Sequence, residues 1–465
     1  MRRTGLWIAA LAVLPLSAGA QEEAKPPAGV TVYKRIADLK IADEGEGPAK
    51  TISINLERST GLKVAFMAQG TGGVTRAPFN MFDAKSRDNT TAKDYAWVGP
   101  TWRPILYRCD RFRYNAVLNS TVKGDVKYRN IRFHGPATPD KKGVLHLRNF
   151  VIYRGEDTDP PTPPGGLRAK STAKGVHLNW GPGDDNVLPA MYVITRAGAD
   201  GKYAKIAESC ARKYLDKPPA AGDYKYRVLT ADYQDNLSNW CRPVAVKVAK
   251  GFEATKPSDL ETDRAGYAEH VRKIAKAGAG KVVKGRVFLF GDSLTGALNY
   301  QLLTEGALGR YPVEATGRAG WRTGQGRTVI AGDIARTNPQ FCLILYGTNN
   351  SKSAKAIEAA MGDLLAIAEV CEKNGTIPVI ATIPPRGFSD PKSEPEANYN
   401  AALIKTCRAN KIPIAYIFEE MQAQPDRRKQ LAGDGVHWAG EGFVTASRAW
   451  QKAMEQVTFV LLDRP

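Results

Sequence analysis

The chain has 465 residues, a length that indicates about two to four domains rather than one. Its composition, 43% hydrophobic and 24% charged, is ordinary for globular protein and excludes a low-complexity or fibrous chain. The formal net charge of +19 sits mainly in residues 1–158. A basic surface attracts polyanions such as acidic polysaccharides, although it also serves simply to keep a protein soluble.

Residues 1–20 have the three parts of a signal peptide. Met1–Gly5 carries two arginines, Leu6–Leu16 is apolar, and Ala18–Ala20 consists of small residues. We therefore predict a secreted or periplasmic protein. No other apolar stretch approaches the ~20 residues that a membrane span needs, and we expect no transmembrane segment.

Export makes disulfide bonds possible for the six cysteines. Cys210 with Cys241, and Cys371 with Cys407, are the couples that we expect, because each lies within one predicted domain. Cys342 is expected as a small buried hydrophobic residue at the start of a strand.

From residue 31 to 157 apolar and polar residues alternate without a helical period, which predicts an all-β sandwich. In its texture this stretch resembles the jelly-roll ancillary modules of secreted carbohydrate-active enzymes. Aromatic residues between Trp97 and Tyr114 are interleaved with arginines, a combination that suits sugars and anionic groups. The alternative is that these aromatics only fill the core of the sandwich.

A proline-rich stretch, residues 159–166, predicts a stiff hinge. Residues 160–249 then resemble a fibronectin type III domain. The resemblance rests on a leucine after the prolines, a tryptophan on an early strand and a Tyr-x-Tyr-x-Val strand, namely Leu167, Trp180 and Tyr224–Val228. It implies a β-sandwich that acts as a spacer or docking surface without a catalytic role.

Residues 258–465 alternate apolar strands with helices, which predicts a three-layer α/β/α domain around a parallel sheet. The predicted strands are 287–290, 312–316, 342–346, 377–382 and 412–417. The predicted helices are 258–277, one from 294, one from about 326, 353–372, 397–408 and one from 440.

Ser293 follows the first strand of this domain, after Gly291 and Asp292. Ligands bind at the carboxyl ends of strands in open α/β sheets, and a following helix points its amide groups at developing negative charge. Ser293 is therefore a candidate nucleophile. Taken alone, the same turn is better explained as a helix cap.

A nucleophilic serine needs a base, and of the five histidines only His437 lies after Ser293. It stands in a glycine-rich loop before the last helix, three residues after Asp434. One turn can place the Asp434 carboxylate against Nδ1 of His437, which leaves Nε2 free to accept the serine proton. The alternative is a structural histidine, whose ring only makes hydrogen bonds within its own loop.

Two further loops follow the second and third strands of the domain. Gly320 lies in the first and can offer a backbone amide to a substrate, because glycine permits close approach. Asn349 lies in the second and can offer its side-chain amide.

Taken in order, these residues resemble the four sequence blocks of the GDSL or SGNH hydrolase family, and the resemblance covers residues 285–458. The blocks are Gly291–Leu294, Gly320, Gly347–Asn349 and Asp434–His437. The resemblance implies a catalytic triad and an oxyanion hole, but no metal and no organic cofactor. The triad would be Ser293 as nucleophile, His437 as base and Asp434 as its orienter, and the oxyanion hole the amides of Ser293 and Gly320 with the Asn349 side chain.

We therefore expect a secreted serine esterase that acts on polysaccharide-linked esters, most simply O-acetyl groups. The basic amino-terminal portion favours an anionic glycan, which that module would bind, and no nucleic acid is expected as a partner. The alternative enzymes in the family are lipid esterases, lysophospholipases and thioesterases. The alternative of another class is a glycan-binding protein with an inactive hydrolase domain.

Overall fold

The computed structural model describes a large part of the chain. The described residues are 30–42, 50–56, 62–71, 75–77, 79–83, 90–91, 96–108, 113–114, 120–121, 128–133, 144–234, 236–249, 259–304, 313–350, 352–387, 395–426 and 429–462. The predicted signal peptide lies outside these residues and stays a prediction. The same holds for Cys109 and for several of the aromatic and arginine residues between 97 and 114.

The amino-terminal region consists of antiparallel strands. One sheet has the order β1-β12-β3-β8, with bounds Thr31–Ala42, Val144–Arg154, Leu62–Thr71 and Arg103–Arg108. A second has the order β2-β11-β5-β6, with bounds Lys50–Leu56, Tyr128–Phe133, Phe79–Asp83 and Thr90–Thr91. Two small pairs complete it, β4 with β7 (Thr75–Ala77 and Ala96–Val98) and β9 with β10 (Arg113–Tyr114 and Ser120–Thr121).

The second region, which begins after β12, is also antiparallel. Its sheets are β13-β14-β17 (Arg168–Thr172, Gly175–Asn179, Lys213–Asp216) and β16-β15-β18-β19 (Tyr203–Ser209, Pro189–Ala197, Gly222–Asp232, Val244–Val248). The predicted core residues Trp180, Tyr224 and Tyr226 are buried in one hydrophobic cluster with Tyr192. Its core therefore uses the aromatic residues that the sequence singled out.

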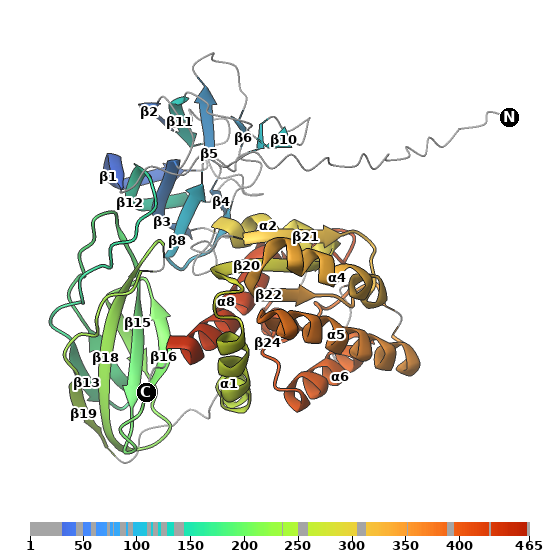
Figure 1. The fold of residues 1–465 in the computed structure, drawn as a ribbon. Coiled ribbons are helices and arrows are strands. Elements are labelled where there is room, and N and C mark those ends of the chain that lie inside the picture. Colours follow the sequence, from blue (N-terminus) through green and yellow to red (C-terminus); the bar gives the residue numbers. More distant parts are fainter. Residues whose placement is uncertain are drawn as a thin grey trace.

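The carboxyl-terminal domain is built on a parallel sheet of order β21-β20-β22-β23-β24, and helices cover it in Figure 1. The strands are Val313–Arg318, Val283–Asp292, Pro339–Leu345, Ile377–Ala381 and Ile414–Ala415. The helices are α1 Asp259–Ala277, α2 Ser293–Thr304, α4 Thr323–Thr337, α5 Ala354–Asn374, α6 Pro395–Ala409, α7 Ile417–Gln422 and α8 Gly440–Leu462. This confirms the predicted α/β architecture with its parallel sheet. None of the helices in the described part has the length and apolarity to cross a bilayer.

Several element boundaries in this domain differ from the prediction; β20 and β22, for example, begin at Val283 and Pro339, earlier than the predicted starts at 287 and 342. Helix α4 begins at Thr323, three residues before the predicted start at Gly326. The predicted strand 412–417 is only Ile414–Ala415, and its end belongs to α7, which starts at the buried Ile417. A short buried apolar run fits a strand or a helix equally well, so periodicity did not separate them.

The expected disulfide couples are not formed. Cys241, Cys371 and Cys407 are free thiols. Cys371 instead lies beside Cys342 of β22, and both are fully buried, because the inner face of α5 packs on the sheet. Cys342 is thus the buried hydrophobic residue that we expected.

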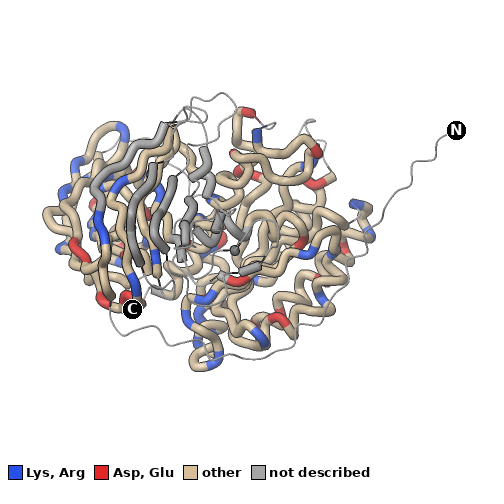
Figure 2. The backbone as a smooth tube through the Cα atoms, turned by 90° about the horizontal axis from the view of Figure 1, so that it is seen from above, with Lys and Arg blue, Asp and Glu red and all other residues tan. Residues whose placement is uncertain are grey.

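Contacts join the three regions. Met67 and Tyr153 of the amino-terminal sheet share a buried cluster with Val187 and Tyr233 of the second region. Helix α8 extends from the α/β domain to strand β16 of the second region (Figure 1). Lysines and arginines are spread over all parts of the described chain rather than gathered on one of them (Figure 2).

Close backbone packing holds α2 against β21. A Cβ atom built on Gly317 of β21 would lie 2.2 Å from the backbone nitrogen of Gly296 and 2.3 Å from its Cα. The approach is therefore open only to glycine. It positions the helix whose first residue is Ser293.

We predict that Gly317→Ala lowers the melting temperature of the full chain. The added methyl meets backbone atoms that cannot rotate away, a kind of overpacking that costs about 1–3 kcal/mol. Gly332→Ala is the matched control, because no atom lies within 4 Å of a Cβ at that exposed position on α4. Thermal unfolding of both variants checks this; equal melting temperatures would contradict the packing argument.

Candidate active site

Ser293 stands at the junction of β20 and α2. A Cβ on Gly291 would lie 2.0 Å from Thr295 Oγ1 and 2.3 Å from the Leu345 carbonyl oxygen, so the turn is closed tightly against the next strand. The Asp292 carboxylate accepts a hydrogen bond from the Leu294 amide at 3.0 Å. The serine is thus held at the carboxyl edge of the sheet, and the first turn of α2 starts at its own amide.

The structure brings Ser293, His437 and Asp434 together. The Ser293 hydroxyl lies 3.0 Å from Nε2 of His437. On the other side of the ring, Nδ1 of His437 lies 2.6 Å from Oδ2 of Asp434. This is the order of contacts that lets an imidazole accept a hydroxyl proton while a carboxylate stabilises the resulting imidazolium.

Asp434 is held in its charged form. Its other oxygen accepts the backbone amides of Val436 at 2.9 Å and His437 at 3.0 Å. The His437 side chain, followed by these amides, holds the pKa of the Asp434 carboxyl well below its usual range. The side chains of His437 and Asp434 are 45% and 50% exposed, so this side of the site is open to a large substrate.

Trp438 ties the histidine loop to the serine turn. Its indole N–H donates to the Leu294 carbonyl at 3.0 Å, and its ring is buried. Within the loop, the Ala432 amide donates to the His437 carbonyl at 2.8 Å. The distance between His437 and Ser293 is therefore supported by a second bond between the same two segments.

Gly320 and Asn349 lie in the two neighbouring loops, as their positions in the sequence predicted. Gly320 has φ +75°, and a Cβ there would meet no atom within 4 Å, so a side chain at this position would point into open space. The Asn349 side-chain amide donates to the Trp321 carbonyl at 3.1 Å, which joins the two loops. An amide group has two N–H donors, and this bond uses one of them.

The Asn350 side chain both accepts and donates a hydrogen bond at Thr323, which a charged aspartate, an acceptor only, cannot do. Its carbonyl oxygen accepts the Thr323 amide at 3.2 Å, and its amide group donates to the Thr323 hydroxyl at 2.9 Å. The hydroxyl in turn donates to Asp363 at 2.9 Å. Asn350 thus ties the loop after β22 to the start of α4.

Lys352 fastens the loop that carries Asn349. Its ammonium donates to the carbonyl groups of Gly347 at 2.8 Å and Asn350 at 2.9 Å, and lies over the Tyr399 ring. Burial lowers the pKa of Lys352 to about 8, opposed by the charge of Glu396. The Gly347 carbonyl also accepts the Asn350 amide at 3.0 Å, so the lysine adds further donors to the turn after β22.

Asp292 is fully buried directly before the serine. Burial raises the pKa of its carboxyl to about 7, opposed by the Leu294 amide and by the charges of His437 and Lys352. Its second oxygen has no hydrogen-bond partner within the described part of the chain. The site therefore contains two carboxyl groups whose pKa values are shifted in opposite directions. The exposed Asp434 has a lowered pKa, and the buried Asp292 has a raised one.

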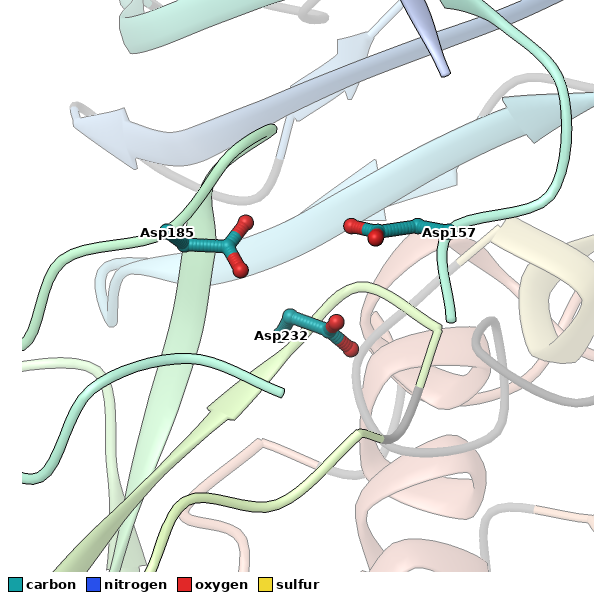
Figure 3. A group of neighbouring side chains, drawn as sticks. All are labelled: Asp157, Asp185 and Asp232. Carbon is teal, nitrogen blue, oxygen red and sulfur yellow. The ribbon is translucent and has the colours of Figure 1, made fainter. Parts of the chain in front are cut away.

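The described residues include one group with the donors of a metal site, away from Ser293. The carboxylate oxygens of Asp157, Asp185 and Asp232 lie within 4.8 Å of one another and point toward one another (Figure 3). Oxygen donors of this kind suit Ca²⁺. Hydrogen bonds from Asn186 to Asp157 and from Asn236 to Asp232 already occupy part of this set, and we assign no metal to it.

Sequence reasoning missed the residues that connect the loops. Trp438, Thr323 and Lys352 do not touch the Ser293 hydroxyl. The partners of Trp438 and Thr323 are far away in the chain, and those of Lys352 lie within its own loop. The one available signal was position, because Trp438 directly follows the predicted base.

Comparisons with known proteins give one family match and several similar structures. Residues 289–443 match the model of the GDSL-like Lipase/Acylhydrolase family. No curated protein matches the chain. The chain is similar to a solved GDSL-like lipase from Bacteroides thetaiotaomicron, with 22% identity over 41% of this chain and 98% of that one, and a TM-score of 0.32.

Two other solved structures are similar to it. An acetyl xylan esterase shares 17% identity over 36% of this chain and 98% of that one, with a TM-score of 0.32. A family 3 carbohydrate esterase from Clostridium thermocellum shares 17% identity over 37% of this chain and 96% of that one, with a TM-score of 0.29. On the family match, the carboxyl-terminal α/β domain of this chain is a GDSL/SGNH hydrolase domain.

Proposed function

We propose that the protein is a secreted serine esterase in which Ser293 is the nucleophile, His437 the base and Asp434 its orienter. One observation carries the proposal: the His437 ring lies 3.0 Å from the Ser293 hydroxyl and 2.6 Å from the Asp434 carboxylate. A merely structural loop histidine needs neither contact. The family match supports ester hydrolysis as the reaction class.

The reaction follows from these contacts. The Ser293 oxygen attacks the ester carbonyl while Nε2 of His437 takes its proton, and a tetrahedral oxyanion forms. The amides of Ser293 and Gly320 and the Asn349 side chain donate to this oxyanion. His437 then protonates the leaving alcohol, which departs and leaves an acyl group on Ser293. Water deprotonated by His437 releases the acid and restores the serine.

The proposed substrate is an O-acetyl ester on an anionic polysaccharide. The support is the predicted export, the two antiparallel β regions before the hydrolase domain and the formal charge of +19. Half-exposed His437 and Asp434 side chains also suit a substrate that extends beyond the site. Lipid esters and thioesters are the alternative substrates.

We predict that a fluorophosphonate probe labels the wild-type chain on Ser293 and does not label Ser293→Ala. The probe reacts with a serine that a neighbouring base activates, so labelling separates an enzyme from a binding protein with an inactive domain. Intact-mass spectrometry and peptide mapping check the modified residue. Thr295→Ser, which keeps a hydroxyl two residues away, is the control and should label at Ser293 alone. An unlabelled wild-type chain would remove the enzyme proposal.

Asn349→Ala should reduce kcat by about 100-fold or more, because one oxyanion donor is lost. The matched control is Asn239→Ala, an exposed asparagine of the second β region. Steady-state hydrolysis of 4-nitrophenyl acetate checks both variants, with thermal unfolding to verify that they are folded. A folded Asn349→Ala variant within about threefold of wild type would exclude this residue from the oxyanion hole.

For the substrate, we expect acetate release from an acetylated acidic polysaccharide to exceed hydrolysis of long-chain 4-nitrophenyl esters in kcat/KM. The comparison uses one enzyme preparation, with Ser293→Ala as the blank for spontaneous hydrolysis. A preference for long acyl chains would replace the carbohydrate ester with a lipid ester as the substrate.

A further inference from the structure

A cavity of about 780 Å³ lies between the amino-terminal sheet and the second β region. Trp102 and Arg148 line it from the first, and Tyr192, Arg212 and Lys213 line it from the second. The volume lies within the range of small-molecule binding sites. The shared buried cluster of Met67, Tyr153, Val187 and Tyr233 keeps the two walls together.

The charged residues in this cavity have one sign. Arg148, Arg212 and Lys213 line it, and no lining residue is a carboxylate. None of these three cations has an ion-pair partner among the residues that the structure describes. A concave surface lined by one sign of charge concentrates ligands of the opposite sign.

The Trp102 ring holds the Arg148 side chain in position, but one hydrogen-bond donor of Arg148 has no partner within the described residues. Its guanidinium lies over the Trp102 ring, with Cζ 4.1 Å from the ring centroid. Its Nε is buried and has no hydrogen-bond partner within the described residues. Because Arg148 lines the cavity, its guanidinium can pair with a carboxylate or sulfate of a ligand there, a geometry that guanidinium prefers.

The neutral lining suits a sugar. Trp102 contributes aromatic surface beside the Arg148 guanidinium, and the exposed Asn149 and Asn179 offer amide groups for the hydroxyls of a sugar. Asn149 has φ +53°, at the point where the pairing between β12 and β3 shifts register. This bulge interrupts the ladder beside Arg148, as bulges near binding sites commonly do.

We propose that this cavity binds an acidic sugar unit of a polysaccharide, with Arg148 and Arg212 as the receptors of its charged group. The inference deepens the proposed function and rests on it for the link to turnover. The binding itself is independent of catalysis.

The position of the cavity makes it an anchoring site rather than part of the catalytic site. An adjoining cavity shares Trp102 and reaches Gln451 and Glu455 of α8. Helix α8 begins at Gly440, and the stretch from there to Gln451 is about 16 Å long at the rise of an α-helix. A small ester therefore cannot occupy both sites, whereas a polysaccharide chain can.

The test measures binding by the full chain carrying Ser293→Ala, so that substrate is not consumed. The probes are polygalacturonate, dextran sulfate, neutral dextran and a single-stranded oligonucleotide of comparable charge, all at about 0.15 M salt, where exposed charges are largely screened. We expect binding to polygalacturonate or dextran sulfate and none to neutral dextran. Binding to polygalacturonate identifies the acidic group as a carboxylate, and binding to dextran sulfate identifies it as a sulfate. Equal or tighter binding to the oligonucleotide would overturn the proposal, because it would show a general polyanion surface.

Arg148→Gln/Arg212→Gln should weaken binding by about tenfold or more, since charge-assisted hydrogen bonds to the ligand are lost. Arg168→Gln/Arg242→Gln removes the same charge from exposed positions outside the cavity and should change binding less than about twofold. If Arg148→Gln impairs folding, Arg212→Gln/Lys213→Gln replaces it, because both side chains are exposed. Equal losses in cavity and control variants would overturn the proposal.

On the active enzyme, the cavity variants should lower kcat/KM for the acetylated acidic polysaccharide relative to that for 4-nitrophenyl acetate, again by about tenfold. An unchanged ratio together with normal hydrolysis would refute the anchoring site and leave the esterase intact. Lack of hydrolysis with retained cavity-dependent binding would refute the esterase and leave the site.

Discussion

The His437 imidazole joins two segments that are 144 residues apart in the chain, and the candidate site depends on this contact. The contact needs the serine turn, the histidine loop and the sheet edge to be placed within tenths of an ångström. Gly317 lets α2 approach β21, and the Trp438 indole bonds to Leu294 beside the serine. Each of these supports acts on backbone, which is stiffer than a pair of side chains.

The proposed oxyanion donors and the proposed triad are parts of one connected set of loops. Asn349 donates a hydrogen bond to the Trp321 carbonyl, and Asn350 bonds to Thr323. Lys352 donates hydrogen bonds to carbonyl groups of the same turn. All follow strands of a parallel sheet, whose carboxyl ends share one edge. A shift of one loop would therefore be transmitted to the next, which is how the geometry stays fixed without a metal ion in the proposed mechanism.

Sequence reasoning located the strands and helices of the α/β domain because its strands are apolar runs and its helices have clear starts and ends. It was wrong where the spacing of apolar residues does not distinguish a strand from a helix. The run 412–417 became a two-residue strand followed by α7, and the predicted cysteine couples were wrong because Cys371 packs on β22 rather than on α6. The ancillary regions were predicted as β structure, and antiparallel sheets are present in both. Their family assignments remain predictions.

The sequence by itself singled out the residues that we propose to carry the chemistry, because a serine after a buried strand, a single later histidine and a nearby aspartate are readable as types and spacings. Only the tertiary structure decided how they meet: the 2.6 Å contact of Asp434, the role of Trp438 and the asparagine matched to Thr323. It alone also placed Arg148 over Trp102 at a cavity between two regions. Apart from the contact of Asp434 with His437, three residues away, these contacts join residues far apart in the chain, and local preference carries no information about such distances.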